Sequence, residues 1–148
     1  MAFKKVRVTM HHVRNDATGD DSGDQLELYG RFDAARLAFD PGIGEVLTFE
    51  SQNLWDKSAE NAVDLDTGSA EVVEIAAVLQ IFDGEFLQVT GHINEEDDGF
   101  GGGDDHMGSI DMRIPFSDIK TTVLPIGQFA ESDQRASVKI STHVVQQG

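Results

Sequence analysis

The stretch FLQVTGHINEEDDGFGGGDDHMGSIDMRIP, residues 86–115, decides how this chain folds. Its first part alternates apolar and polar residues, with Leu87 and Val89 on one side, which is typical of a half-buried β-strand. The same alternation returns near the end of the stretch, at Ile110 and Met112, and Pro115 closes it. The stretch therefore predicts two strands joined by a loop.

The loop between these strands is strongly acidic and rich in glycine. It carries six carboxylates within eleven residues, namely Glu95, Glu96, Asp97, Asp98, Asp104 and Asp105. Carboxylates at this density repel one another unless water or a cation screens them. Ca²⁺ takes roughly 6–8 oxygen ligands, so this loop suits a hard cation of that kind.

The composition limits the classes of function. The chain has 148 residues, the size of one ordinary domain spanning residues 1–148, and it has no cysteine for a disulfide, a thiolate zinc site or a cysteine nucleophile. Its formal net charge is −16, with 27 acidic residues against 11 lysines and arginines. Such a chain repels nucleic acids, and without metal it also repels anionic membranes.

The sequence contains no targeting or membrane-spanning segment that we can recognise. No apolar run approaches the ~20 residues of a membrane helix. The first residues, MAFKKVRVTMHHV, alternate as a strand does and lack the apolar core of a signal peptide. We expect a cytoplasmic protein, one exported without a cleaved leader, or one domain of a longer chain, with peripheral attachment to a membrane as an option.

Short strands recur along the chain. We expect them at residues 4–13, 25–32, 45–50, 71–82, 85–94, 107–115, 120–124 and 136–145. Segment 71–82 fits a helical stripe as well as a strand, and we choose a strand because its neighbours are strands. Asp83-Gly84 resembles a two-residue hairpin turn. About eight strands without a long helix predict an all-β fold, an antiparallel β-sandwich.

Two segments are expected to lie outside the sheets. Residues 34–44 read as one helical turn or an irregular connection that ends at Pro41 and Gly42. Residues 51–69 show little periodicity and read as a long loop, with a short helix at 57–62. Within that loop, Trp55 fits a plug in the core or a staple for the loop better than a ligand platform.

A second acidic segment lies between the first two expected strands. Its carboxylates are Asp16, Asp20, Asp21 and Asp24. Loops at one end of a sandwich come together although they are far apart in sequence. If this segment meets the loop after residue 94, the mutual repulsion would cost several kcal/mol in a partly desolvated cleft, and a divalent ion would reverse it.

The two acidic segments resemble those of a known family. VRVTMHHVRNDATGDDSGDQLELYG is similar to the first calcium loop of the C2 domain, the calcium- and lipid-binding sandwich of protein kinase C and synaptotagmin. LQVTGHINEEDDGFGGGDDHMGSIDMRIPFSDI is similar to its third loop, with Glu95 and Asp97 as the acid-x-acid pair and Asp105 opening the Asp-x-x-Gly element. Asp24 matches the aspartate that opens the second strand, and ASVKISTHVV resembles the closing strand.

Some residues depart from the C2 pattern. Thr18 stands where the family has an aspartate, so Asp16, Asp20 or Asp21 must serve instead, and Gln25 replaces a common proline. The tip of the third loop is longer and richer in glycine. The resemblance implies an eight-stranded Greek-key sandwich, with the permuted strand order found in part of the family.

The resemblance also implies a function and a set of site residues. Ca²⁺ would be held by Asp16, Asp20, Asp21, Asp24, Glu95, Asp97 and Asp105, and would cancel the charge of the loops. The rim could then attach to an anionic phospholipid surface or to an acidic protein surface. Phe100, between two glycines, would either dip into the bilayer or fold back as an anchor of the loop.

Other chemistries have weaker support. Consecutive strand residues point to opposite faces, so His11 and His12 are not expected to share one metal, although His106 could bind a softer metal than Ca²⁺. No Gly-x-Ser-x-Gly element is present. Asp97 and Asp105 could in principle serve glycoside hydrolysis, but one Trp and one Tyr give little surface for a sugar, and we do not expect an enzyme.

Three hypotheses follow from the sequence. The first is a Ca²⁺-dependent module that binds phospholipid membranes. The second is a module that binds protein, in which Ca²⁺ only rigidifies the loops. The third is a metal-independent structural or interaction sandwich within a larger assembly, whose acidic loops are merely solvated. The sequence does not decide the oligomeric state or the number of ions.

Overall fold

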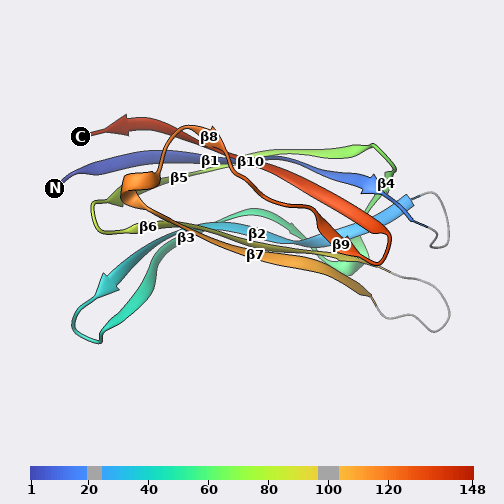
Figure 1. Cartoon of the computed structure of the whole chain (residues 1–148), viewed down its shortest axis with the longest axis horizontal. Coiled ribbons are helices and arrows are strands. Elements are labelled where there is room, and N and C mark those ends of the chain that lie inside the picture. The colour runs from blue at the N-terminus through green and yellow to red at the C-terminus, as the bar shows by residue number, and fades with distance from the viewer. Residues whose placement is uncertain (20–24, 97–103) are drawn as a thin grey trace.

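The computed structural model describes residues 1–19, 25–96 and 104–148, and it is a sandwich of two antiparallel β-sheets (Figure 1). Sheet A has the order β5 (Ala70–Phe82), β1 (Phe3–Ala17), β10 (Gln134–Gln147) and β8 (Thr122–Val123), and β9 (Phe129–Glu131) also pairs with β10. Sheet B has the order β3 (Glu45–Lys57), β2 (Gln25–Asp40), β6 (Phe86–Glu95) and β7 (Asp105–Pro115), and β4 (Val63–Asp66) also pairs with β2. The predicted all-β sandwich is confirmed.

The core lies between the inner faces of the two sheets, as the alternation of apolar residues predicts. Val6, Val8 and Met10 of β1 are fully buried, and so are Leu87 and Val89 of β6. Burial of each such side chain stabilises the fold by about 1.5–3 kcal/mol.

Aromatic rings fill the centre of this core. The ring of Phe32 lies 6.2 Å from Trp55 and 5.9 Å, edge-on, from Phe129. Trp55 is 3 % exposed, which confirms it as a plug in the core. A Cβ built on Gly91 would lie 2.1 Å from the Phe32 ring, so glycine at this position makes room for the phenylalanine.

The connection predicted at residues 34–44 is wrong, because β2 continues as a strand to Asp40. Alanine-rich sequence has low strand propensity, but β2 pairs with β3 on one side and with β6 on the other over most of its length. Pairing on both sides outweighs a weak local preference. Only the turn between Asp40 and Glu45 remains irregular.

The long loop predicted at residues 51–69 is also mostly wrong. β3 continues through this segment to Lys57 by pairing with β2, and β4 adds a further short strand. The expected short helix is a single 3-10 turn, η1 (Ala59–Asn61). A second 3-10 turn, η2 (Phe116–Asp118), follows β7.

Asp83 and Gly84 form a tight turn but not a hairpin between paired strands. The Glu85 N–H donates to the Phe82 carbonyl at 2.9 Å, and Gly84 adopts a φ of +86°. The strands that they join belong to different sheets, because β5 is in sheet A and β6 is in sheet B. The turn therefore closes one end of the sandwich.

The strand count within the described ranges is ten, compared with the predicted eight. The extra strands are short, and β9 in particular has three residues with little periodicity to reveal it. Neither of the 3-10 turns, nor any other helix in the described ranges, has the length and apolar character needed to cross a bilayer.

Candidate functional site at the acidic end

The strands that flank the two acidic segments end at the same end of the sandwich. β2 begins beside the end of β6, with Leu28 paired to Glu95, and the Glu96 N–H donates to the Glu27 carbonyl at 2.8 Å. β1 ends nearby, where the Asn15 N–H donates to Ser69 in the turn after β4. We call this region, shown at the right of Figure 1, the acidic end.

Glu95 and Asp105, two of the predicted calcium ligands, are direct cross-strand partners. Glu95 is the last residue of β6, Asp105 is the first residue of β7, and the antiparallel register pairs them. Glu95 is 7 % exposed. Like charges directly opposite each other on neighbouring strands destabilise a sheet, and more so where water is excluded.

Asp16, a third predicted ligand, lies on β1 with its carboxylate held by protein groups. The side-chain amide of Gln128 donates to it at 3.0 Å, and the Arg14 guanidinium lies 3.4 Å away. Its side chain is 12 % exposed. The negative charge of Asp16 is therefore already compensated by protein groups, and a metal ion would have to displace them.

The remaining predicted residues lie outside the described residues. They are Asp20, Asp21, Asp24, Asp97 and Phe100. Within the residues that the structure describes, no three His, Asp or Glu side chains are close enough together to hold a metal ion. The carboxylates that the structure describes at the acidic end therefore do not form a metal site among themselves.

Thr18, which stands where the C2 pattern has an aspartate, has a structural role. It is buried, and its hydroxyl hydrogen-bonds with the Thr67 hydroxyl at 2.7 Å and accepts from the Asn15 side-chain amide at 2.8 Å. Asn15 also donates to the Leu65 carbonyl at 2.8 Å. This buried network ties β1 to the turn after β4 and leaves Thr18 unsuited to bind an exposed ion.

Sequence reasoning missed a polar network on the outer face of sheet B beside the acidic end. The Tyr29 hydroxyl donates a hydrogen bond to Asp104, and Asn94 and His106 are hydrogen-bonded at 2.7 Å. Desolvation of Tyr29 and its bond to Asp104 raise the pKa of the phenol to about 12. Tyr29 and Asp104 are 75 positions apart, so only the strand register could have revealed their contact.

The two neighbouring histidines of β1 do not follow the alternation that we assumed. A β-bulge between Met10 and His12 interrupts the regular pattern. His11 contacts Glu74 at 3.1 Å and Ser141 at 2.6 Å, so both of its ring nitrogens are occupied by protein partners.

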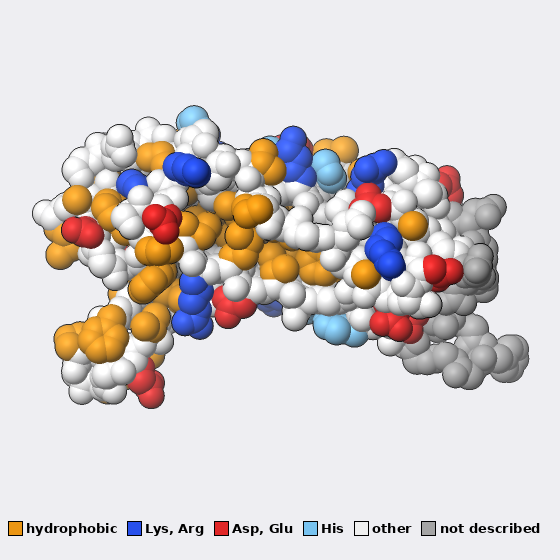
Figure 2. Space-filling view, in the orientation of Figure 1, with side chains coloured by type: hydrophobic (Ala, Val, Ile, Leu, Met, Phe, Trp, Pro, Cys, Tyr) orange, Lys and Arg blue, Asp and Glu red, His pale blue; other side chains and the backbone are white. Residues whose placement is uncertain are grey.

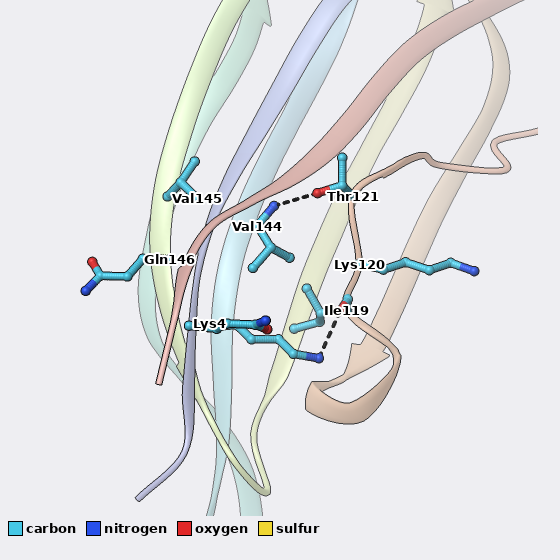
Figure 3. A pocket seen from close by; sticks show the side chains of 8 residues that line it. Lys4, Ile119, Lys120, Thr121, Val144, Val145 and Gln146 are labelled. Atoms are coloured by element: carbon cyan, nitrogen blue, oxygen red, sulfur yellow. Dashed lines mark hydrogen bonds between the residues drawn. The ribbon is translucent and has the colours of Figure 1, made fainter.

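Two cavities lie away from the acidic end. One, of about 480 Å³, is lined by Lys4, Ile119, Lys120 and the end of β10 (Figure 3). The Lys4 ammonium donates to the Phe116 and Ile119 carbonyls at 2.8 and 2.9 Å, while Lys120 points away from Lys4. The Lys4 ammonium is therefore already engaged by protein carbonyls, and its two hydrogen bonds hold η2 in place.

The second cavity, of about 200 Å³, lies between β7 and the segment around β8 and has a mainly apolar lining, with Met112, Ile114 and Leu124 among its residues. Its charged lining residues are one acid and one base, Asp118 and Lys120.

Comparisons with known proteins give only distant likenesses. No family model and no curated protein matches the sequence. Among solved structures, the chain is similar to one described as "CC2D1B coordinates ESRCT-III activity during the mitotic reformation of the nuclear envelope", with a TM-score of 0.46 and 8% identity. That match covers 95% of this chain and 55% of the other, so the chain spans about half of that protein's length.

The chain is also similar to human GIVD cytosolic phospholipase A2 in complex with methyl gamma-linolenyl fluorophosphonate. One such structure, which also contains terbium chloride, gives a TM-score of 0.42 and 12% identity over 97% of this chain and 18% of the other. A second gives 0.43 and 13% over 97% and 17%. Likenesses of this degree do not assign a function to the chain.

Proposed function

We propose that this chain is a C2-like calcium-binding module that attaches to an anionic phospholipid surface, or to a protein, through its acidic end. The proposal is carried by one observation, the cross-strand pairing of Glu95 with Asp105 at the base of one acidic segment, beside the start of β2. Two opposed carboxylates, one of them buried, gain stability from a nearby cation. The acids of residues 20–24 and 97–103 would provide the further oxygen ligands.

When bound, Ca²⁺ would supply positive charge at this end and so permit contact with phosphate groups. The chain's own residues would position the acidic segments. β2, β6 and β7 fix the bases of the acidic segments, and the Glu96–Glu27 hydrogen bond holds two of these bases together. Without metal, a net charge of −16 repels an anionic surface, so attachment would depend on calcium.

Co-sedimentation with phosphatidylserine vesicles tests the membrane arm of the proposal. We expect binding in millimolar Ca²⁺ and its loss in chelator or with neutral phosphatidylcholine vesicles. Phe100→Ala is expected to weaken vesicle binding while leaving calcium affinity intact. Calcium binding without vesicle binding would favour the protein-attachment arm.

The alternative is a metal-independent structural or protein-interaction sandwich within a larger assembly. The compensation of Asp16 by Arg14 and Gln128 favours it, because this carboxylate needs no metal. Thermal unfolding separates the two functions. A ligand present at 100 times its Kd stabilises the folded state by about 2.7 kcal/mol, so a melting temperature unmoved by millimolar Ca²⁺ would leave only the alternative.

A further inference from the structure

A β-hairpin projects from the end of the molecule opposite the acidic end (Figure 1). The pairing of β2 with β6 stops at Leu37 and Phe86, but the pairing of β2 with β3 continues to Asp40 and Glu45. Residues 38–49 therefore extend beyond the neighbouring strand of their own sheet. We call these residues the arm.

The arm exposes large apolar side chains. Leu37, at its base, is 3 % exposed, whereas Phe39, two residues further along the same side of β2, is 55 % exposed. Phe49 is 54 % exposed, and Ile43 and Val46 are exposed as well. Figure 2 shows hydrophobic side chains gathered on the hairpin that projects at the lower left. Arg36 pairs with the core residue Leu87, so Leu37 and Phe39 lie on the opposite, outer side of β2, and the apolar side chains on that side continue past the last pairing with β6. Phe39 and Val46 are cross-strand partners, and exposed apolar side chains gathered on one hairpin mark an interaction site.

The arm is also acidic. Asp40 and Glu45 are cross-strand partners near its tip, and residues 38–49 include no lysine or arginine. The nearest base in sequence, Arg36, is held by two hydrogen bonds to Glu85, at 2.9 and 2.7 Å. A surface that complements the arm must therefore combine apolar area with unpaired cations.

The outer face of sheet A has this combination. In the strand register Arg7 lies between His143 of β10 and Val78 of β5, and all three are exposed. Lys5 and Lys139 are exposed on the same two central strands. We call these five residues the basic face. Within the described ranges, its lysines and arginine make no ion pair, although acids outnumber bases by 27 to 11 in the whole chain.

We propose that the arm of one copy of this chain docks on the basic face of a second copy. The arm belongs to sheet B, whereas the basic face is the outer surface of the opposite layer. The contact joins two different patches, so it builds rings or open chains of subunits. The interaction stands apart from the calcium proposal, because the arm and the acidic end lie at opposite ends of the molecule.

A lipid bilayer is a poorer occupant for the arm than a second copy. Insertion of the tip would take the paired carboxylates of Asp40 and Glu45 out of water with no cation to compensate them. On the basic face of another copy, Arg7 and Lys139 would compensate them while Val78 meets the apolar side chains.

Sedimentation velocity over a range of protein concentrations, in chelator, tests the contact. We expect concentration-dependent association that weakens as salt rises. The arm variant Phe39→Ser/Phe49→Ser and the face variant Arg7→Glu/Lys139→Glu should each weaken association at least tenfold. Matched controls are Val123→Ser, which removes an apolar side chain that is 55 % exposed elsewhere, and Arg113→Glu, which reverses a charge on the other sheet.

Mixing the two variants gives the sharper result. The face variant keeps an intact arm and the arm variant keeps an intact basic face, so the mixture should form a one-to-one heterodimer and stop there. Circular dichroism and melting curves confirm that both variants fold. A wild-type chain that stays monomeric at 100 μM, or a mixture without heterodimer, overturns the proposal. Binding of a monomeric chain to phosphatidylcholine vesicles, lost in the arm variant, would assign the arm to lipid instead.

Discussion

Glu95 and Asp105 face each other across the first pair of the β6–β7 ladder, beside the hydrogen bond that joins Glu96 to Glu27. The sheet thus brings the bases of two acidic segments together and places like charges opposite each other at that point. Like charges directly opposite each other destabilise an antiparallel pair, by an amount comparable to the ~0.2–1 kcal/mol that favourable cross-strand pairs contribute. The calcium proposal rests on this pairing, because a cation near the strand end would reduce the repulsion between the two carboxylates.

Asp105→Asn should therefore stabilise the metal-free protein slightly, because it removes one of the two opposed charges. Urea unfolding in chelator measures the effect, which we expect to be less than about 1 kcal/mol. Asp111→Asn, on the exposed side of β7, is the matched control. A loss of metal-free stability specific to Asp105→Asn would show instead that this carboxylate holds structural hydrogen bonds.

The Tyr29 phenol should lose its proton at a higher pH than an ordinary tyrosine. It is the sole tyrosine of the chain, so tyrosinate absorbance reports it alone, with an expected midpoint at a pH of about 12. Because its folded pKa lies above the ordinary value of 10.0, the associated stability is fully present below pH 10 and is lost as pH rises through the folded pKa. Asp104→Asn should lower the midpoint, and an unchanged midpoint would contradict the hydrogen bond.

The Arg36–Glu85 pair should make the free energy of unfolding depend on pH in the acidic range. Desolvation opposes ionisation of Glu85, but hydrogen bonds from Arg36 and from the Phe82 N–H outweigh it and hold its pKa below 4.5. The stability that this pair contributes is present above the pKa of Glu85 in the unfolded chain, and it is lost as the pH falls through the pKa of Glu85 in the folded protein. Glu85→Gln should cost about 1–3 kcal/mol at pH 7 and progressively less below pH 4. An equal cost at both pH values would rule out the charge as its cause.

Gly91 should tolerate no side chain while Phe32 is present. A methyl group at this position would overlap the Phe32 ring, so Gly91→Ala is expected to cost about 1–3 kcal/mol in chemical denaturation. In the Phe32→Leu background, which removes ring atoms, the same substitution should cost less. Additive costs in the double variant would show that the two residues do not compete for space.

The strand pattern could be predicted where burial on one side imposes alternation. Leu87 and Val89, or Val6 and Val8, show this alternation and lie on the inner faces of the sheets. Prediction from alternation failed for two segments. Residues 34–40 are a strand because β2 pairs with β3 and with β6, and residues 51–57 are a strand because β3 pairs with β2. Prediction also failed at Asp83-Gly84, because a local turn signal does not specify which sheet the next strand joins.

The site was predictable only in its general location. The clustering of acids pointed to two segments, and the structure brings their flanks to one end of the sandwich. The compensation of Asp16 by Gln128, 112 positions away, and the burial of Thr18 against Thr67 depend on long-range packing. No local pattern encodes contacts of that kind.

Isothermal calorimetry with Ca²⁺ tests the central claim most directly. Heat should be released or absorbed with a saturable isotherm for the wild-type chain, and Asp105→Asn or Asp97→Asn should weaken the affinity at least tenfold, while Asp111→Asn leaves it unchanged. If the wild-type chain gives no saturable signal at millimolar Ca²⁺, or if Asp105→Asn and Asp97→Asn bind as tightly as wild type, the acidic end is not a calcium site.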